Sequence, residues 1–122
     1  AMITRQRILV VDDDPSIRDM CSMVLRDDEG YEVQTAVDGQ DAIDHLGCAP
    51  DLILLDIGMP LMDGREFVRR LRSLAKFRST PVLVMTAQIG AADVVGSQGT
   101  IRKPFDVEAL LGRVANLLPA AA

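Results

Sequence analysis

Short runs of hydrophobic residues recur along this chain and are separated by amphipathic stretches. Leu52 to Leu55 follow one another with no polar residue between them, which is typical of a strand buried on both faces in the middle of a parallel sheet. Similar runs occupy residues 7–11 and 81–85. Residues 31–36 alternate more, which favours a strand nearer the sheet edge, and a short last strand is expected at 100–103. The pattern therefore predicts five strands.

The amphipathic stretches that follow the strands predict helices. Asp14 is a good N-cap and Pro15 a good first helical residue, so a helix should begin here and end at Gly30. Three further helices are expected, with their starts at or next to Gly39, Gly64 and Asp106. The helix after Gly64 is expected to run to Lys76. It has the clearest apolar face, made of Phe67, Val68, Leu71 and Ala75.

The connection between the fourth and fifth strands is short. Only 16 residues, 87–102, separate Thr86 from Lys103. Once a strand and two loops are subtracted, room remains for about two helical turns, near the lower limit for a crossover between parallel strands. Glycines weaken a helix, and this connection contains Gly90, Gly96 and Gly99. We therefore expect a fourth helix that is short, displaced or poorly ordered.

Alternating strands and helices predict an α/β fold, a single doubly wound (βα)5 three-layer sandwich with a five-stranded parallel sheet. In such sheets the carboxyl ends of all strands lie at one edge, where ligands bind. Polar residues follow or end four of the predicted strands. We expect these side chains to meet in one crevice, although they are far apart in the sequence: Asp12, Asp13, Asp56, Thr86 and Lys103.

Composition narrows the class of protein. A chain of 122 residues suits one domain, and none of its hydrophobic runs approaches the roughly 18 residues needed to span a bilayer. No secretory signal is apparent, so we expect a cytoplasmic protein without a membrane partner. Residues 1–5 and 119–122 are expected to be flexible ends or remnants of a linker or tag. The net charge of −5 argues against direct nucleic-acid binding and fits a cation or a basic partner.

The expected cluster of carboxylates indicates a chemistry. Carboxylates held close together repel one another, so they either keep protons or recruit a cation. Mg²⁺ suits carboxylates combined with a backbone carbonyl, water and a phosphoryl oxygen. Lys103 and Thr86 offer a positive charge and a hydroxyl donor to phosphoryl oxygens. Asp56, held by the central strand, is then the best candidate to attack phosphorus.

Four motifs in this chain resemble those of the receiver domains of two-component response regulators. They occur in the expected order over nearly the whole chain, so that residues 1–122 read as one receiver domain. The motifs occupy Val10 to Asp14, Leu55 to Gly64, Met85 to Ala87, and Lys103 to Phe105. The resemblance implies a flavodoxin-like fold. It also implies a regulatory domain that catalyses only its own phosphorylation and dephosphorylation, and is not otherwise an enzyme.

The resemblance also implies a role for each site residue. Asp56 would accept a phosphoryl group from the phosphohistidine of a histidine kinase or phosphotransfer protein. Asp13, Asp56 and the backbone carbonyl of Gly58 would bind Mg²⁺ or Mn²⁺ directly, and Asp12 would act through water. Thr86 would bond a phosphoryl oxygen and move toward it, and Lys103 would pair with the phosphate. The small side chain of Ala87 would leave the phosphate accessible.

Two departures from the family concern the switch. Receivers usually carry an aromatic residue three positions before the lysine, and this chain has Thr100 there. The connection after Thr86 is also several residues shorter than is usual in the family. Thr86 and Thr100 therefore mark the switch position without the usual aromatic side chain. The output partner is unidentified from the sequence, and homodimerisation is left open.

Other interpretations remain. A degenerate receiver could bind a partner constitutively, as the departures at the switch suggest. An aspartyl-phosphate phosphatase or phosphotransferase is suggested by two aspartates spaced like Asp12 and Asp14 after a buried strand, although Ser16 and its neighbours fit that motif poorly. The arginine-rich helix after Gly64 is most simply a solvated face, with docking of an acidic partner as the alternative.

Overall fold

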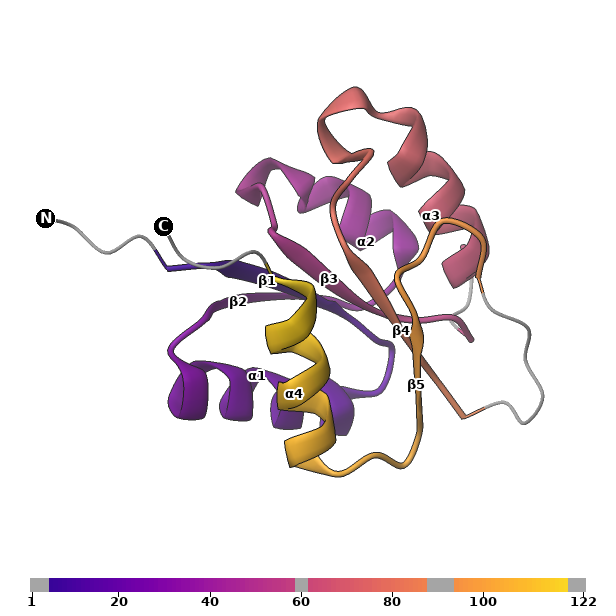
Figure 1. Ribbon diagram of the computed structural model, residues 1–122. Coiled ribbons are helices and arrows are strands. Elements are labelled where there is room, and N and C mark those ends of the chain that lie inside the picture. The colour runs from indigo at the N-terminus through magenta and orange to yellow at the C-terminus, as the bar shows by residue number, and fades with distance from the viewer. Residues whose placement is uncertain (1–4, 59–61, 88–93, 119–122) are drawn as a thin grey trace, which may run out of the picture.

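The sheet contains the five predicted strands, all parallel, in the order β2-β1-β3-β4-β5. The computed structural model describes residues 5–58, 62–87 and 94–118. The strands are β1 (Arg7–Val11), β2 (Glu32–Ala36), β3 (Leu52–Asp56), β4 (Val82–Thr86) and β5 (Thr100–Arg102). The continuous hydrophobic run of β3 lies in the middle of the sheet and the alternating β2 lies at an edge, as predicted (Figure 1).

Helices cover both faces of this sheet. The described α-helices are α1 (Pro15–Glu29), α2 (Gly39–Asp44), α3 (Gly64–Ser73) and α4 (Val107–Leu117), with short 3₁₀ turns η1 (Leu46–Cys48) and η2 (Ala75–Phe77). Helices α1 and α4 lie on one face, and α2 and α3 lie on the other (Figure 1). The predicted doubly wound three-layer fold is therefore confirmed. None of the described helices has the length and apolar character needed to span a membrane.

Aspartate side chains begin all four of these helices. Asp14, Asp38, Asp63 and Asp106 each take the N-cap position and accept a hydrogen bond from a backbone N–H of the first turn. Such caps satisfy donors that have no partner inside the helix, and the negative charge suits the positive end of the helix dipole. Each cap therefore fixes where the chain leaves the carboxyl edge of the sheet and enters a helix.

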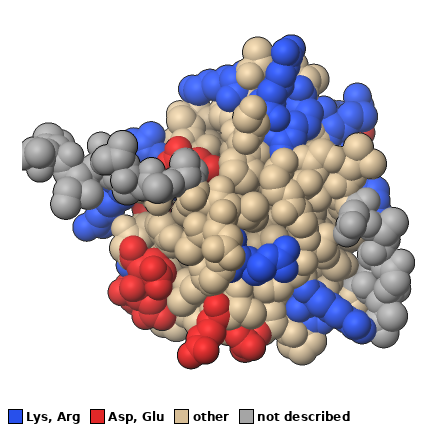
Figure 2. Space-filling view, viewed as in Figure 1, with Lys and Arg blue, Asp and Glu red and all other residues tan. Residues whose placement is uncertain are grey.

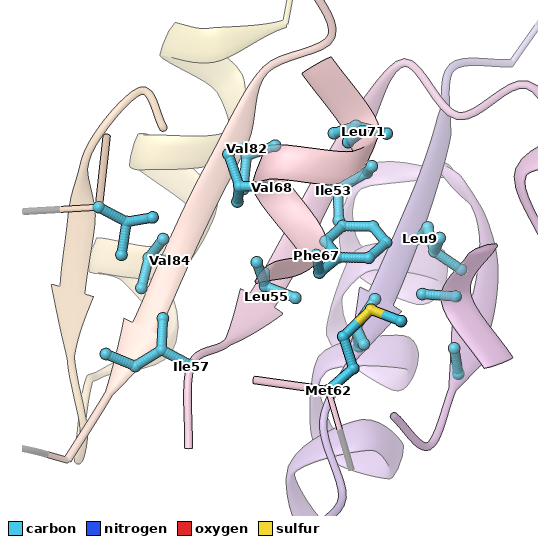
Figure 3. Packing of buried hydrophobic residues seen from close by; sticks show 14 of the residues in the cluster. Leu9, Ile53, Leu55, Ile57, Met62, Phe67, Val68, Leu71, Val82 and Val84 are labelled. Carbon is cyan, nitrogen blue, oxygen red and sulfur yellow. The ribbon is translucent and has the colours of Figure 1, made fainter. Parts of the chain in front are cut away.

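The hydrophobic core lies on both sides of the central strand. Every residue of β3 and of β4 is buried. In Figure 3 the ring of Phe67 from α3 lies close to Ile53 and Leu55 of β3. On the opposite face, Leu54 packs in a second cluster with residues of α1 and α4, among them Leu25. Because both faces of β3 are packed, its last residue is held in a fixed position.

The end of α3 corrects one prediction. The helix was expected to run to Lys76 with Ala75 on its buried face, but it ends at Ser73 and Ala75 is exposed. The physical reason is the extended backbone of Leu74, with φ −91° and ψ 118°, which turns the chain out of the helix. The buried ring of Phe77 in η2 packs against the core instead.

The connection between β4 and β5 contains no helix in the part that the structure describes, residue 87 and residues 94–99. The short fourth helix was expected within this connection, of which residues 88–93 lie outside the described residues. The flexible ends predicted at 1–5 and 119–122 also lie outside them, except for Arg5, which is exposed.

Gly64→Ala should destabilise the fold, because a Cβ atom at this position would lie 2.7 Å from the Cα atom of Ile57. The Gly64 N–H donates a 3.2 Å hydrogen bond to the Ile57 carbonyl, so the two backbones cannot separate without losing it. We expect the free energy of unfolding, measured in urea, to fall by about 1 to 3 kcal/mol.

The matched control is Gly112→Ala, inside α4, where an added Cβ atom meets nothing within 4 Å. This variant should unfold at the same or a higher urea concentration, with a gain of up to about 1 kcal/mol from helix propensity. Equal stability of the wild type and Gly64→Ala would contradict the close packing described at this turn.

Candidate functional site

Three carboxylates meet at the carboxyl edge of the sheet. Strands β1 and β3 are in parallel register, with Val11 opposite Leu55, so Asp12 and Asp56 occupy equivalent positions at the ends of neighbouring strands. One carboxylate oxygen from each of Asp12, Asp13 and Asp56 lies within 4.8 Å of the others. Asp12 and Asp56 are buried and Asp13 is exposed. The expected proximity of these residues is present in the structure.

Lys103 lies against this cluster. Its Nζ atom is 2.7 Å from Oδ2 of Asp12 and 3.7 Å from Oδ1 of Asp56. The other oxygen of Asp12, Oδ1, accepts a 2.9 Å hydrogen bond from the backbone N–H of Asp14. Asp12 has no exposed surface. The contact with Lys103 and the hydrogen bond from Asp14 therefore compensate for the loss of hydration of the Asp12 carboxylate.

Burial changes the acid–base behaviour of Asp56. Burial, followed by the charge of Asp12, raises the pKa of Asp56 above its ordinary value of 3.8. The hydrogen bond from the Gly58 N–H, 3.3 Å long, and the charge of Lys103 oppose this rise in pKa. The Asp56 carboxylate is therefore held in an environment that favours a proton or a cation beside it.

Lys103 remains a cation in this environment. Burial lowers the pKa of its ammonium group, but the hydrogen bond and charge of Asp12 and the charge of Asp56 outweigh burial, so its pKa is raised. Its backbone N–H donates a 2.7 Å hydrogen bond to the carbonyl of Thr86. This bond ties the chain after β5 to the end of β4, which positions the lysine at the same edge as the carboxylates.

The remaining expected site residues take different positions. Thr86 is the buried last residue of β4, next to Met85, which is in register with Asp56. Ala87 follows it and is exposed, as is Gly58 beyond β3. Thr100 lies at the start of β5, in register with Val84, and is half-buried. Thr100 therefore does not lie at the edge where Asp56 and Thr86 end their strands.

Two neighbours of Asp12 were missed by sequence reasoning. Nη1 of Arg18, in α1, donates a 2.7 Å hydrogen bond to the backbone carbonyl of Asp12. Cys21 is buried nearby, and burial, followed by the charge of Asp12, raises the pKa of its thiol to about 11. Neither residue belongs to a recognisable motif. The predicted start of a helix at Pro15 was the one signal that placed both residues in the helix directly after Asp12.

The donor set of this edge suits a hard divalent cation. Three carboxylates offer oxygen ligands, and they include neither a thiolate nor an imidazole. Oxygen ligands of this kind are preferred by Mg²⁺, Ca²⁺ and Mn²⁺. Lys103 adds a positive charge that can pair with a second anion, so the edge can hold a cation and a phosphoryl group together.

Comparison with known proteins decides the family. A family model described as the response regulator receiver domain matches residues 8–115. The chain belongs to this family. The predicted resemblance to receiver domains is therefore confirmed.

Curated relatives support the same assignment. The chain is 42% identical over 118 residues to the DNA-binding dual master transcriptional regulator RpaA of Synechocystis, which covers 92% of this chain and 48% of that protein. It is 40% identical over 116 residues to the DNA-binding response regulator MtrA of Mycolicibacterium smegmatis, covering 90% of this chain and 49% of that protein. The receiver thus spans about half the length of the curated relatives it matches.

Solved structures show the same fold. The chemotaxis response regulator CheY4 of Vibrio cholerae is 39% identical, with a TM-score of 0.87 over 94% of this chain and 100% of that one. The response regulator TrrA of Thermotoga maritima, solved in complex with Mg²⁺ and BeF, is 32% identical, with a TM-score of 0.82 over 93% of this chain and 99% of that one.

Asp56→Asn should make the receiver more stable at neutral pH in buffer containing EDTA. A carboxyl group whose pKa is raised by folding contributes stability at low pH and loses it as the pH rises through its folded pKa. Asparagine cannot ionise. The difference in free energy of unfolding between Asp56→Asn and wild type should therefore be small near pH 4 and grow as the pH rises.

Urea denaturation at a series of pH values measures this difference. The matched control is Asp27→Asn, which neutralises an exposed carboxylate of α1 and should keep the wild-type pH dependence. An Asp56→Asn variant that is less stable than wild type at pH 7 would show that the burial and charges around Asp56 have been misjudged.

Proposed function

We propose that this receiver is a phosphoacceptor switch of a two-component system and that Asp56 is the residue phosphorylated. The observation that carries the proposal is the position of the Asp56 carboxylate. It is buried at the end of the central strand, within 4.8 Å of ligand oxygens of Asp12 and Asp13, and 3.7 Å from Nζ of Lys103. A fixed carboxylate beside a cation-binding cluster and a lysine is suited to attack on phosphorus.

The proposed donor is the phosphohistidine of a histidine kinase or phosphotransfer protein, or a small phosphodonor. A carboxylate oxygen of Asp56 forms a bond to phosphorus as the bond between phosphorus and the imidazole nitrogen breaks. The bonding electron pair returns to the imidazole, which takes up a proton. The product is an aspartyl phosphate, which the same edge of the receiver later hydrolyses. In this proposal the domain catalyses reactions of its own side chain only.

Mg²⁺ or Mn²⁺ fits the donor set, and Asp13, Asp56 and the carbonyl of Gly58 would hold it, with Asp12 nearby. When bound, the ion would neutralise negative charge on the phosphoryl oxygens. Lys103 is already within 3.7 Å of the Asp56 carboxylate, so a small movement of its side chain suffices to pair it with the phosphate.

Thr86 and Ala87 complete the proposed site. Thr86 ends the strand beside β3, and its hydroxyl would donate to a phosphoryl oxygen. The exposed Ala87 presents only a methyl group, so a donor protein or water can reach the phosphate.

The proposed consequence of phosphorylation is a change in binding to an output domain or separate partner. Two matched relatives are described as DNA-binding regulators, which supports a DNA-binding output domain rather than DNA binding by the receiver itself. A constitutive interaction domain is the second candidate. It is favoured by Thr100, which lies half-buried at the start of β5 where an aromatic switch residue is usual.

Incubation with Mg²⁺ and acetyl phosphate tests the proposal. Wild-type receiver should gain the mass of one phosphoryl group, and hydroxylamine should remove it because an acyl phosphate is labile to this nucleophile. Asp56→Asn should abolish the gain in intact-protein mass spectra. The control Asp51→Asn alters an exposed carboxylate just before the same strand and should leave the labelling unchanged.

The alternatives give other results. Continuous release of phosphate at a rate far above that of one labelling event would indicate a phosphatase. A wild-type chain that is never labelled would indicate a constitutive module. Labelling of Asp56→Asn to the wild-type extent would place the phosphoacceptor elsewhere.

A further inference from the structure

Positive charge in this receiver is concentrated on one segment. Residues 64–78, which span α3 and η2, contain six of the 13 basic residues and one acidic residue, while the whole chain has a net charge of −5. In Figure 2 a group of basic side chains lies at the top, over the region where α3 and η2 lie in Figure 1, and other basic side chains lie at the left, the centre and the lower right. Acidic side chains gather lower down, over the region of α1 and α4. The molecule therefore has a basic face built on α3.

A groove runs between α3 and the connection that leads into β5. Its volume is about 490 Å³. The side chains that line it are of two kinds, namely three arginines and three valines: Arg65, Arg69, Arg72, Val68, Val94 and Val95. Val68 and Val94 are buried beneath it, whereas Val95 is 94% exposed. Exposure of an aliphatic side chain to this extent beside an apolar floor leaves apolar area for a partner to cover.

Arg72 fixes the far wall of the groove. Its Nη2 atom donates to the Gly96 carbonyl at 2.7 Å and to Oε1 of Gln98 at 3.0 Å, and its Nη1 atom donates to the Phe77 carbonyl at 2.6 Å. Oε1 of Gln98 also accepts a 2.7 Å hydrogen bond from the backbone N–H of Val82, at the start of β4. The wall is therefore tied to both α3 and the sheet.

The backbone at Gly96 makes this attachment close. Gly96 has φ +89°, and a Cβ atom there would lie 3.1 Å from Cγ1 of Val68. The connection thus packs directly on α3 through a residue without a side chain. A groove with walls held in this way is largely formed before a partner arrives, which lowers the entropic cost of binding.

The arginines of the groove retain a net positive charge. Glu66 forms ion pairs with both Arg69, at 2.6 Å, and Arg70, at 3.1 Å. One carboxylate therefore serves two guanidinium groups, and Arg65 and Arg72 add two more charges to the same helix. Charge of this sign over an apolar floor is complementary to a segment that combines carboxylates with aliphatic side chains.

We propose that this groove binds a partner polypeptide segment that carries acidic and aliphatic side chains. An aliphatic side chain of the partner would pack on the exposed Val95, over the buried Val68 and Val94, and flanking carboxylates would pair with Arg65 and Arg69. The lining favours a polypeptide over a nucleic acid, because the apolar side chains among its described residues are aliphatic and offer no aromatic surface for base stacking. The proposal does not depend on phosphorylation of Asp56.

Fluorescence anisotropy with synthetic peptides tests this proposal. The probe is a fluorescein-labelled peptide of 12 residues with leucine at helical spacing and glutamate elsewhere. One matched peptide has serine in place of leucine, and another has lysine in place of glutamate. The glutamate–leucine peptide should bind wild-type receiver at least about tenfold more tightly than either, because each lacks one of the two required features.

Variants locate the site. Val95→Ser should weaken binding of the probe about tenfold through lost apolar contact, and Arg65→Glu about fivefold through reversed charge. The matched controls are Met23→Ser, which removes a 57% exposed side chain from α1, and Arg5→Glu, which makes the same charge change at an exposed position before β1. Both controls should bind as wild type does. Unchanged thermal unfolding would show that all four variants are folded.

Several results would overturn the proposal. If Arg5→Glu and Arg65→Glu weakened binding of the probe equally, the affinity would depend on the overall charge of the receiver and not on this groove. Equal affinity for the serine peptide and the glutamate–leucine peptide would show that the valines do not contribute to binding. Tighter binding of a labelled 12-residue oligothymidine would favour nucleic acid. A wild-type dimer in sedimentation that Val95→Ser dissociates would assign the groove to a second copy of the chain.

Discussion

The mutual repulsion of Asp12, Asp13 and Asp56 is the constraint on which this structure depends. Their ligand oxygens lie within 4.8 Å of one another, and two of the three residues are buried. Aliphatic packing on both faces of β1 and β3 holds these carboxylates in place. Lys103 compensates for part of the charge through its 2.7 Å contact with Asp12. The hydrophobic core thus holds the three carboxylates together against their mutual repulsion. An arrangement of this kind favours binding of a cation.

Much of this arrangement could be predicted from the sequence, because it follows from pattern and topology. The continuous run of β3 and the alternating run of β2 predict their central and edge positions, and the shared carboxyl edge predicts that Asp12 and Asp56 meet. The partners of long side chains could be predicted less well, because each such side chain can reach several groups. Lys103 contacts Asp12 more closely than Asp56, and Arg18 reaches the Asp12 carbonyl. Such choices depend on rotamers and packing, which leave no periodic signal.

The end of α3 shows a second limit. Ala75 continues the helical spacing of the apolar face, yet the helix ends at Ser73 because Leu74 is extended. Local propensity does not oppose another helical turn here; burial of Phe77 and its carbonyl's bond to Arg72 accompany the turn away from the helix. Tertiary contacts of this kind override the hydrophobic pattern at helix ends.

The connection between β4 and β5 is the segment in which we expected departures from the usual pattern of the family. Its described part is held by Arg72 and by close packing of Gly96 on α3, rather than by a helix of its own. Thr100, where the resemblance led us to expect an aromatic residue, then begins β5 in register with Val84. Both departures lie between Thr86 and Lys103 in the chain, whereas Asp56 is held by the buried strand β3.

Thermal unfolding with increasing Mg²⁺, compared with an EDTA-treated reference, tests most directly whether the carboxylate edge is a cation site. A ligand that binds only the folded state raises the unfolding midpoint. We expect this rise for wild type and for Asp14→Asn, since asparagine also caps α1 and Asp14 is outside the cluster. The rise should be largely lost in Asp13→Asn. An unchanged midpoint in wild type, or equal rises in all three proteins, would contradict the conclusion that these carboxylates form a cation site.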